Sequence, residues 1–161
     1  MPAVALGRRA MLSLLLPLVI LMGGLAVDSM GLSARPVDIS SDWQPVELRA
    51  PLTAQTGNPR LLVYLRDLES LGVARRRVVE DLPRVLPPGS IEAATYDRAG
   101  TRYPLTHTGY SFYRGMPGIV LERDGVPRGT TFFRLEVRAV RPLDNVLMVW
   151  LDSLGSARPE P

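Results

Sequence analysis

Apolar and polar residues alternate along 133–139, where Phe, Leu, Val and Ala are separated by two arginines and a glutamate. This period of two predicts a strand with one buried and one solvated face. The apolar runs at 61–65 and 146–151 are continuous, as in central strands that are buried on both faces. Shorter patterns predict further strands at 46–50, 110–113 and 119–122.

A β-hairpin is expected at 91–105, where two strand-like runs flank a turn at 97–100 that ends in Gly100. Pro104 lies in the second run and has no backbone N–H to donate to a neighbouring strand. The returning strand of the hairpin is therefore expected at a sheet edge.

One segment has the period of a helix. Apolar residues recur at spacings of three and four at Leu71, Ala74, Val78 and Leu82, and Pro83 follows. The spacing predicts a short amphipathic helix that ends before the proline. Short strands separated by turns, with a single helix, are typical of a small β-sandwich or a compact barrel, so the expected fold class is mainly β.

Residues 10–27 carry no charged side chain, follow Arg8 and Arg9, and end at Asp28. As a helix, eighteen residues at 1.5 Å each span about 27 Å, close to the thickness of a bilayer core. The two arginines favour a cytoplasmic location for residues 1–9, which places the rest of the chain outside the cytoplasm. We therefore expect a single-pass transmembrane anchor in the inner membrane of a bacterial cell envelope.

A cleaved signal peptide is the alternative for the same segment, because Gly24 and Ala26 place small residues where a signal peptidase reads the chain. Cleavage near Ala26 would release a secreted protein. Both interpretations place the folded domain outside the cytoplasm.

After the apolar segment, residues 28–45 are rich in serine, proline and aspartate and are interpreted as a linker. Trp43 is the one large aromatic residue in it. It suits either a membrane-interface anchor or the first side chain of the folded domain. The β-rich extracytoplasmic domain is expected over 46–154, followed by a loose tail at 155–161.

The composition restricts the chemistry of the chain. Its 161 residues include no cysteine, which excludes disulfides, thiolate metal sites and thiol nucleophiles. The net charge is +3, but Arg8 and Arg9 precede the apolar segment, so 17 arginines stand against 16 acidic residues in the remainder. A net charge of +1 in that part does not indicate a nucleic-acid partner.

No catalytic or cofactor motif is found. His107 is the only histidine, whereas a metal site needs several ligands and a general base needs a partner. No serine lies in the Gly-x-Ser-x-Gly context of a nucleophile elbow, and no glycine run has the spacing of a phosphate loop. We expect no cofactor and no metal, and a hydrolase built on His107 is the least favoured function.

Two groups of side chains are candidates for binding. One is Arg75, Arg76 and Arg77, which could hold lipid head groups or an acidic partner, or could simply form a solvated helix face. The other lies in 96–114, and its candidate binding residues are Arg98, Arg102, Tyr103, Tyr110, Tyr113 and Arg114. Arginine and tyrosine are enriched at protein interfaces, although aromatic residues are also common in ordinary strands.

These observations favour a non-enzymatic, membrane-anchored accessory or assembly subunit of an envelope complex. In this hypothesis the membrane holds the chain, and the β domain binds a protein partner. The alternative is a binding module for an envelope glycan or lipid, with the segment 96–114 as its platform.

Overall fold

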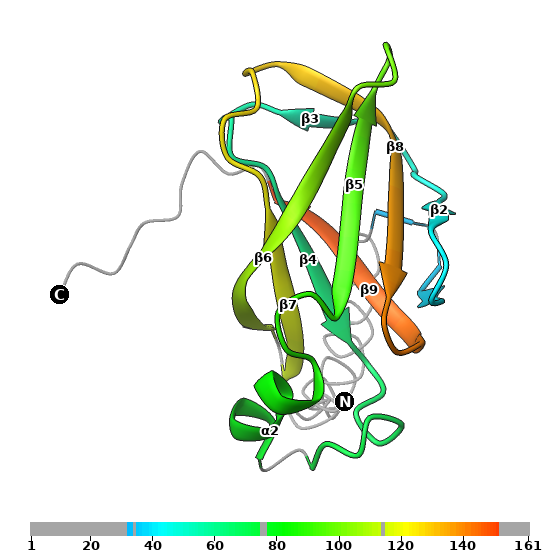
Figure 1. The fold of residues 1–161 in the computed structure, drawn as a ribbon, viewed down its shortest axis with the longest axis vertical. Helices are drawn as coiled ribbons and strands as arrows, with labels where there is room; N and C mark the ends of the chain where they lie inside the picture. The colour runs from blue at the N-terminus through cyan, green and yellow to red at the C-terminus, as the bar shows by residue number, and fades with distance from the viewer. Residues whose placement is uncertain (1–31, 34, 75–76, 114, 152–161) are drawn as a thin grey trace, which may run out of the picture. The chain divides into compact units, whose positions relative to one another are not determined.

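The computed structural model describes residues 32–33, 35–74, 77–113 and 115–151. In these ranges nine antiparallel strands form a barrel-like sheet, and one short helix, α2 (Val78–Val85), lies at one end of it (Figure 1). The prediction of a mainly β fold with one short helix is therefore confirmed, in its barrel-like form.

The predicted membrane anchor at 10–27 lies outside the described ranges, as do the tail at 155–161 and the residues Arg75, Arg76 and Arg114. Within those ranges, no helix has the length and apolar character that a membrane span requires. The anchor therefore stays a prediction from the sequence.

The strands follow the chain as β1 (Val37–Ile39), β2 (Gln44–Val46), β3 (Leu52–Ala54), β4 (Arg60–Leu65), β5 (Ile91–Asp97), β6 (Arg102–Tyr113), β7 (Met116–Glu122), β8 (Thr130–Ala139) and β9 (Leu143–Leu151). In space they are ordered β1-β9-β4-β7-β6-β5-β8-β2, and β3 also pairs with β8. The predicted hairpin is present as β5 and β6, with Gly100 at a left-handed φ of 82° in its turn.

Strand β6 joins the two halves of the sheet. Its first part, Arg102 to Leu105, pairs with β5, and its second part, Thr106 to Tyr113, pairs with β7. The strand predicted separately at 110–113 is thus the end of β6. The edge position predicted from Pro104 is wrong for the whole strand, which is interior in the order. Pro104 is accommodated because its part of β6 has a ladder partner on one side only.

The strand predicted at 46–50 is misplaced. Val46 ends β2, and residues 47–51 form an irregular connection to β3. Regular pairing begins earlier, with β1 and β2, in the part of the chain interpreted as a linker. Ile39 is only 1% exposed, because β1 pairs with β9 and turns this side chain into the core. A few apolar residues in a polar stretch are enough to add edge strands to an existing sheet.

The helix is shorter and begins later than predicted. Leu71 and Ala74 precede α2, and Gly72 between them has a φ of 69°, which an α-helix does not allow. Leu71 and Leu82 are both buried, so their spacing reflects a shared core and not a shared helix. Pro83 lies inside α2 and not after it, at the cost of one backbone hydrogen bond.

The main core fills the space between the two halves of the barrel. Leu135 and Val137 of β8 are fully buried, whereas the charged residues between and beside them lie on the outer face. In β9, the four residues 146–149 are all 6% exposed or less. The burial of Leu135, Val137 and residues 146–149 agrees with the sequence prediction, because the period of side chains along a strand decides which of them meet the core. The prediction that Phe133 also packs inward is wrong, because a bulge in β8 shifts this residue out of the alternation and leaves it 46% exposed.

The two ends of the strand order, β1 and β2, meet at a seam, since only a short loop separates them. The Gln44 side chain closes the seam beside this loop. Its Oε1 accepts hydrogen bonds from Ser40 N at 3.2 Å and from Ser40 Oγ at 2.7 Å, and its Nε2 donates to Asp38 O. One amide side chain thus takes the place of ladder hydrogen bonds between two edge strands.

Farther along the seam, other contacts join the two halves. Leu32 N donates to Met148 O, and Leu32 O accepts from Arg49 N, both at 2.9 Å. Trp150 of β9 donates through Nε1 to Thr53 O of β3 at 3.1 Å. A cavity of about 600 Å³ opens on the seam between β1 and β2, lined by residues 33, 35–37 and 45–47.

Candidate interaction surface

The arginine and tyrosine residues predicted as one binding group do not share a face. Arg102 and Tyr103 are adjacent in β6, so their side chains point to opposite sides of the sheet. The Tyr103 hydroxyl donates to Asp97 Oδ2 at 3.2 Å, and its ring meets the buried Phe132 ring edge-on at 5.3 Å. Burial raises the pKa of Tyr103, and its hydrogen bond to Asp97 adds to this effect. Tyr103 therefore packs against the core.

The other two predicted tyrosines are also held inside the domain. The Tyr110 hydroxyl donates to Leu86 O at 2.9 Å, which ties β6 to the end of α2, and burial raises the pKa of Tyr110. The Tyr113 ring packs against the buried Tyr64 ring at 5.9 Å. In both cases the aromatic residue has the ordinary packing role that strands favour.

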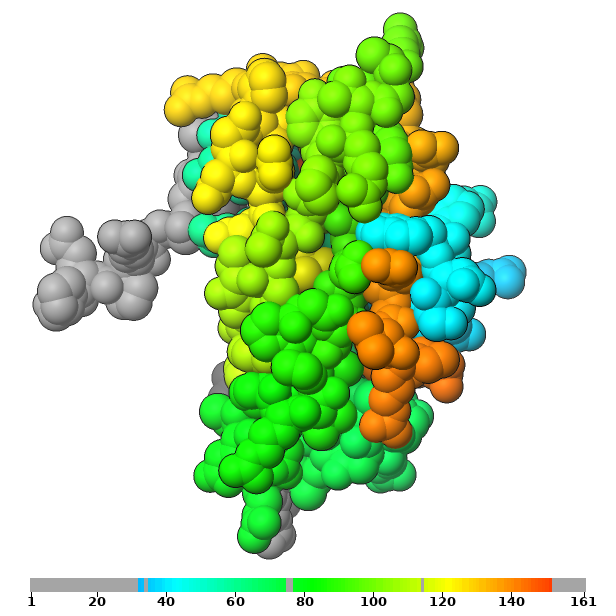
Figure 2. All heavy atoms as spheres, in the orientation of Figure 1, coloured from blue at the N-terminus to red at the C-terminus, as the bar shows by residue number. Residues whose placement is uncertain are grey.

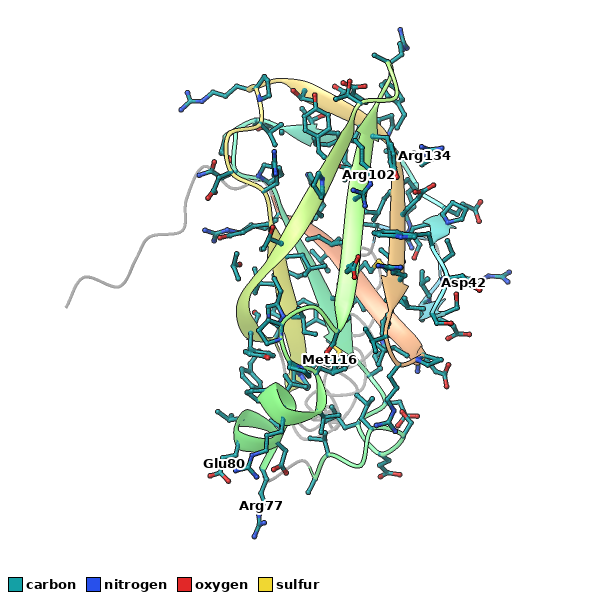
Figure 3. All side chains as sticks on the ribbon, in the orientation of Figure 1. Asp42, Arg77, Glu80, Arg102, Met116 and Arg134 are labelled. Atoms are coloured by element: carbon teal, nitrogen blue, oxygen red, sulfur yellow. The ribbon has the colours of Figure 1, made fainter. Side chains whose placement is uncertain are left out.

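The remaining predicted arginines lie apart from one another. Arg98 lies in the β5–β6 turn, and its guanidinium carbon lies 5.2 Å from the centre of the Phe133 ring. Arg77 precedes α2, at the opposite end of the domain from Arg102 (Figure 3). Arg75, Arg76 and Arg114 lie outside the described ranges, so the head-group hypothesis for the three consecutive arginines is not examined by the structure.

A different set of side chains does gather, on the outer face of β8, β5 and the start of β6, together with one residue from the loop before β2 (Figure 3). We call this set the arginine–aromatic surface. It consists of Trp43, Glu92, Tyr96, Arg98, Arg102, Phe133, Arg134, Glu136 and Arg138. The strand register places Tyr96 opposite both Arg102 and Arg134, and Glu92 opposite Arg138, so these side chains are cross-strand neighbours.

Tyr96, Arg134 and Glu136 form the first cluster of this surface. The Arg134 guanidinium carbon lies 3.9 Å from the centre of the Tyr96 ring, a cation–π distance. The Tyr96 hydroxyl donates to Glu136 Oε2 at 2.6 Å, and Arg134 Nε lies 3.6 Å from Glu136 Oε1. Each of the three side chains contacts the other two, so the cluster is ordered before any partner binds.

Trp43 forms the second cluster, although it comes from the loop before β2. The guanidinium carbons of Arg102 and Arg138 lie 5.1 Å and 5.0 Å from its ring centre. Arg138 also pairs with Glu92 through hydrogen bonds of 2.9–3.2 Å. Ala94 lies on the same outer face, paired with Pro104 and Glu136, and is 0% exposed. Figure 2 shows cyan atoms of this loop extending across β8 to the green strands.

Phe133 is exposed because of a β-bulge. Tyr96 pairs with Arg134 and Asp97 pairs with Phe132, so Phe133 is the extra residue that has no partner on β5. The bulge turns its ring outward, where 46% of the residue is accessible to solvent. Bulges of this kind often redirect a side chain at a functional position.

The charge of the surface is unbalanced. Its four arginines stand against two glutamates, a formal charge of +2. Both glutamates are already paired, with Arg138 and with Arg134. In the described part of the chain, Arg98 and Arg102 each stack on an aromatic ring and have no carboxylate partner. The guanidinium groups of Arg98 and Arg102 are therefore ordered, and their N–H donors are not used by a carboxylate of the described residues.

The sequence prediction missed Trp43 and the β8 residues of this surface, and included three tyrosines that do not belong to it. One signal was present: the alternation along 133–139 marks Arg134, Glu136 and Arg138 as the solvated face of a strand. No local pattern could bring Trp43 next to Arg102, because long-range strand pairing decides that contact.

His107 lies at a bulge in β6, with its ring edge-on to the Tyr110 ring at 4.8 Å. In the described part of the chain, neither ring nitrogen has a hydrogen-bonding partner. Burial lowers the pKa of His107; the Gly109 backbone opposes the shift but is not in good hydrogen-bonding geometry.

The described ranges contain no group of three or more side chains that could bind a metal ion. A small cavity of about 170 Å³ borders the arginine–aromatic surface and is lined by Ser41, Gly89, Glu92, Arg138 and residues 139–140. No family model, curated protein or solved structure matches this chain.

Proposed function

We propose that this protein is a non-enzymatic, membrane-anchored accessory or assembly subunit of a cell-envelope complex. Its β domain binds a protein partner through the arginine–aromatic surface. Arginine, tryptophan and tyrosine are the residues most enriched among those that dominate binding energy at protein interfaces. All three types lie together on one face of the sheet.

The observation that carries the proposal is the exposed Phe133, placed outward by a bulge beside side chains that are already ordered. Its ring is accessible, and Arg98 stacks on it. Ordering a flexible side chain at an interface costs roughly 0.5–1.5 kcal/mol of binding free energy. The side chains of the stacked pairs are already ordered in the free protein, so binding loses less free energy to their ordering. The surface is thus suited to binding in its present form.

The membrane part of the proposal rests on residues 10–27 and on Arg8 and Arg9 before them. They support an inner-membrane anchor with the β domain outside the cytoplasm, where the partner would be another envelope protein. Cleavage near Ala26 would give a released domain with the same binding surface.

A glycan or lipid platform made of the segment 96–114 receives less support. A sugar-stacking platform in this segment would need its predicted tyrosines, Tyr103, Tyr110 and Tyr113, to present their rings together on the outer surface. Tyr103 and Tyr110 instead bond to Asp97 and to the Leu86 carbonyl inside the domain.

The proposal is tested by purifying the tagged native protein in mild detergent and identifying the proteins that accompany it. We expect a stoichiometric envelope partner with the wild type and an intact mass that includes the N-terminal segment. Phe133→Ser should lower the amount of partner by about tenfold, as expected for a residue that dominates binding.

Val79→Ser is the matched control, because Val79 is also an apolar residue at the surface, 67% exposed, but lies in α2 and not on the arginine–aromatic surface. This variant should keep the partner. A wild-type protein that purifies alone and monomeric would refute the accessory-subunit proposal.

A further inference from the structure

We infer that the partner binds this surface with carboxylate groups, and that Arg98 and Arg102 are the residues that receive them. The inference rests on the proposed function, because it names the chemistry of a partner at the same surface. An acidic segment of a polypeptide is the occupant that the charges favour.

The four arginines of the surface differ in what they already bind. Arg138 makes a forked pair with Glu92, and Arg134 is held by Glu136 and by the Tyr96 ring. Arg98 and Arg102 contact only aromatic rings among the described residues. Stacking leaves the edge of a guanidinium group free, so its N–H donors remain available to a planar carboxylate.

A partner that covers Phe133 must also cover Arg98, because the two side chains are stacked at 5.2 Å. Burying an unpaired arginine removes its hydration and is strongly unfavourable unless an anion replaces the water. An apolar patch that bound Phe133 alone would leave this charge uncompensated. A carboxylate beside the apolar contact resolves the conflict.

The same requirement applies to Arg102, because a partner that covers this arginine must also provide an anion for it. It lies opposite Tyr96 in the register and contacts Trp43, so it joins the two clusters of the surface. Its part of β6 pairs with β5 alone, and Arg98 lies in the adjoining turn. The two spare guanidinium groups therefore belong to the same end of one hairpin, where a single acidic segment can meet both.

The chain offers a selective chemical test, because all of its basic residues are arginine and it contains no lysine. The variant Arg102→Lys introduces a single side-chain amine at the proposed contact. In the purified complex, a water-soluble carbodiimide joins such an amine to a carboxylate within contact distance, with loss of one water to the reagent. We expect an amide between residue 102 and an aspartate or glutamate of the partner, located by peptide mass spectrometry.

Arg84→Lys is the matched control, since Arg84 is exposed in the last turn of α2, away from the surface. It should give no adduct with the partner. Equal coupling from both variants, or an adduct of Arg102→Lys with the carboxylate of a glycan, would overturn the inference. A partner that purifies with Arg102→Lys but does not couple to it would overturn the inference and leave the proposed function intact.

A second measurement avoids the chemistry of coupling. The double variant Arg98→Glu with Arg102→Glu should reduce the partner recovered by at least about tenfold, because like charges would face each other across the interface. The variant Arg84→Glu should recover as much as the wild type. Thermal unfolding of each variant checks that the domain is folded, and an unchanged recovery by the folded double variant would contradict the inference.

Discussion

Trp43 illustrates how a single residue can belong to a surface that its own segment does not form. It lies in a polar loop, yet its ring contacts arginines from β6 and β8. Of the two roles open from the sequence, the structure places Trp43 in the folded domain. Its burial is partial, so it both stabilises the sheet and stays available at the surface.

His107 gives a prediction for pH dependence at the residue scale. Burial lowers its pKa from the ordinary 6.5, so the unfolded chain takes up a proton first as the pH falls. The contribution of His107 to the free energy of unfolding is therefore complete above that value. It should be lost progressively as the pH falls through the lower pKa of the folded state.

The measurement is urea unfolding between about pH 7.5 and 5.5, a range above the titration of most carboxylates. The variant His107→Phe keeps a ring against Tyr110 and removes the titrating group, so it should show a flatter profile than the wild type. Identical slopes in the two proteins would show that His107 does not titrate differently on folding.

At the scale of elements, the bulges in β6 and β8 have different structural effects. The irregularity between His107 and Gly109 lies where β6 pairs with β7, after the strand has left β5. The bulge in β8 exposes Phe133 beside the β5–β6 turn. Each bulge locally shifts the register by one residue, which changes the face that a side chain occupies.

Close strand packing predicts the effect of one glycine substitution. Gly118 of β7 pairs with Tyr64 of β4, and a Cβ at this position would lie 2.7 Å from Tyr64 Cδ1 and 2.9 Å from Val63 O. The backbone oxygen cannot move without disturbing the ladder. Gly118→Ala should therefore lower the free energy of unfolding by about 1–3 kcal/mol, measured by urea denaturation.

Gly109→Ala in β6 is the control for this prediction. No atom lies within 4 Å of a Cβ added there, and the residue does not have a positive φ. Its stability should stay within about 0.5 kcal/mol of the wild type. A Gly118→Ala protein as stable as the control would mean that Tyr64 has room to move.

At the scale of the whole domain, the seam between β1 and β2 decides whether the sheet stays closed. Both strands have three residues and lie at the ends of the strand order. Unpaired edges are templates for association with other chains. Here the edges are short, one carries Pro45 without an N–H, and the Gln44 side chain bonds across the loop.

The Gln44 contacts predict that closure of the seam between β1 and β2 depends on both the Oε1 and the Nε2 atom of the Gln44 side chain. Gln44→Glu keeps an acceptor for the Ser40 hydroxyl but places a carboxylate beside the Asp38 carbonyl, which can no longer receive a hydrogen bond. Unfolding free energy should fall by about 1–3 kcal/mol, and hydrogen exchange at the amides of β1 and β2 should become faster. Unchanged exchange rates would show that the seam is held by other contacts, such as Leu32 to Met148.

The candidate surface could be predicted only in part. Arg102 and Arg98 were identified from the arginine and aromatic residues around them, and both belong to the surface. Tyr110 was identified by the same pattern, but its hydroxyl bonds to Leu86 O inside the domain. Composition shows which residue types are present in a strand, but the strand's register and the elements packed on it decide which of them reach the solvent.

The sequence by itself determined the mainly β class, the β5–β6 hairpin and the buried sides of β8 and β9. It could do so because strand period and turn residues are local properties of the chain. Only the tertiary structure decided that Trp43 contacts Arg102 and that Phe133 faces outward. These features depend on pairing between strands far apart in the sequence, and a one-residue difference in register is enough to reverse the face of a side chain.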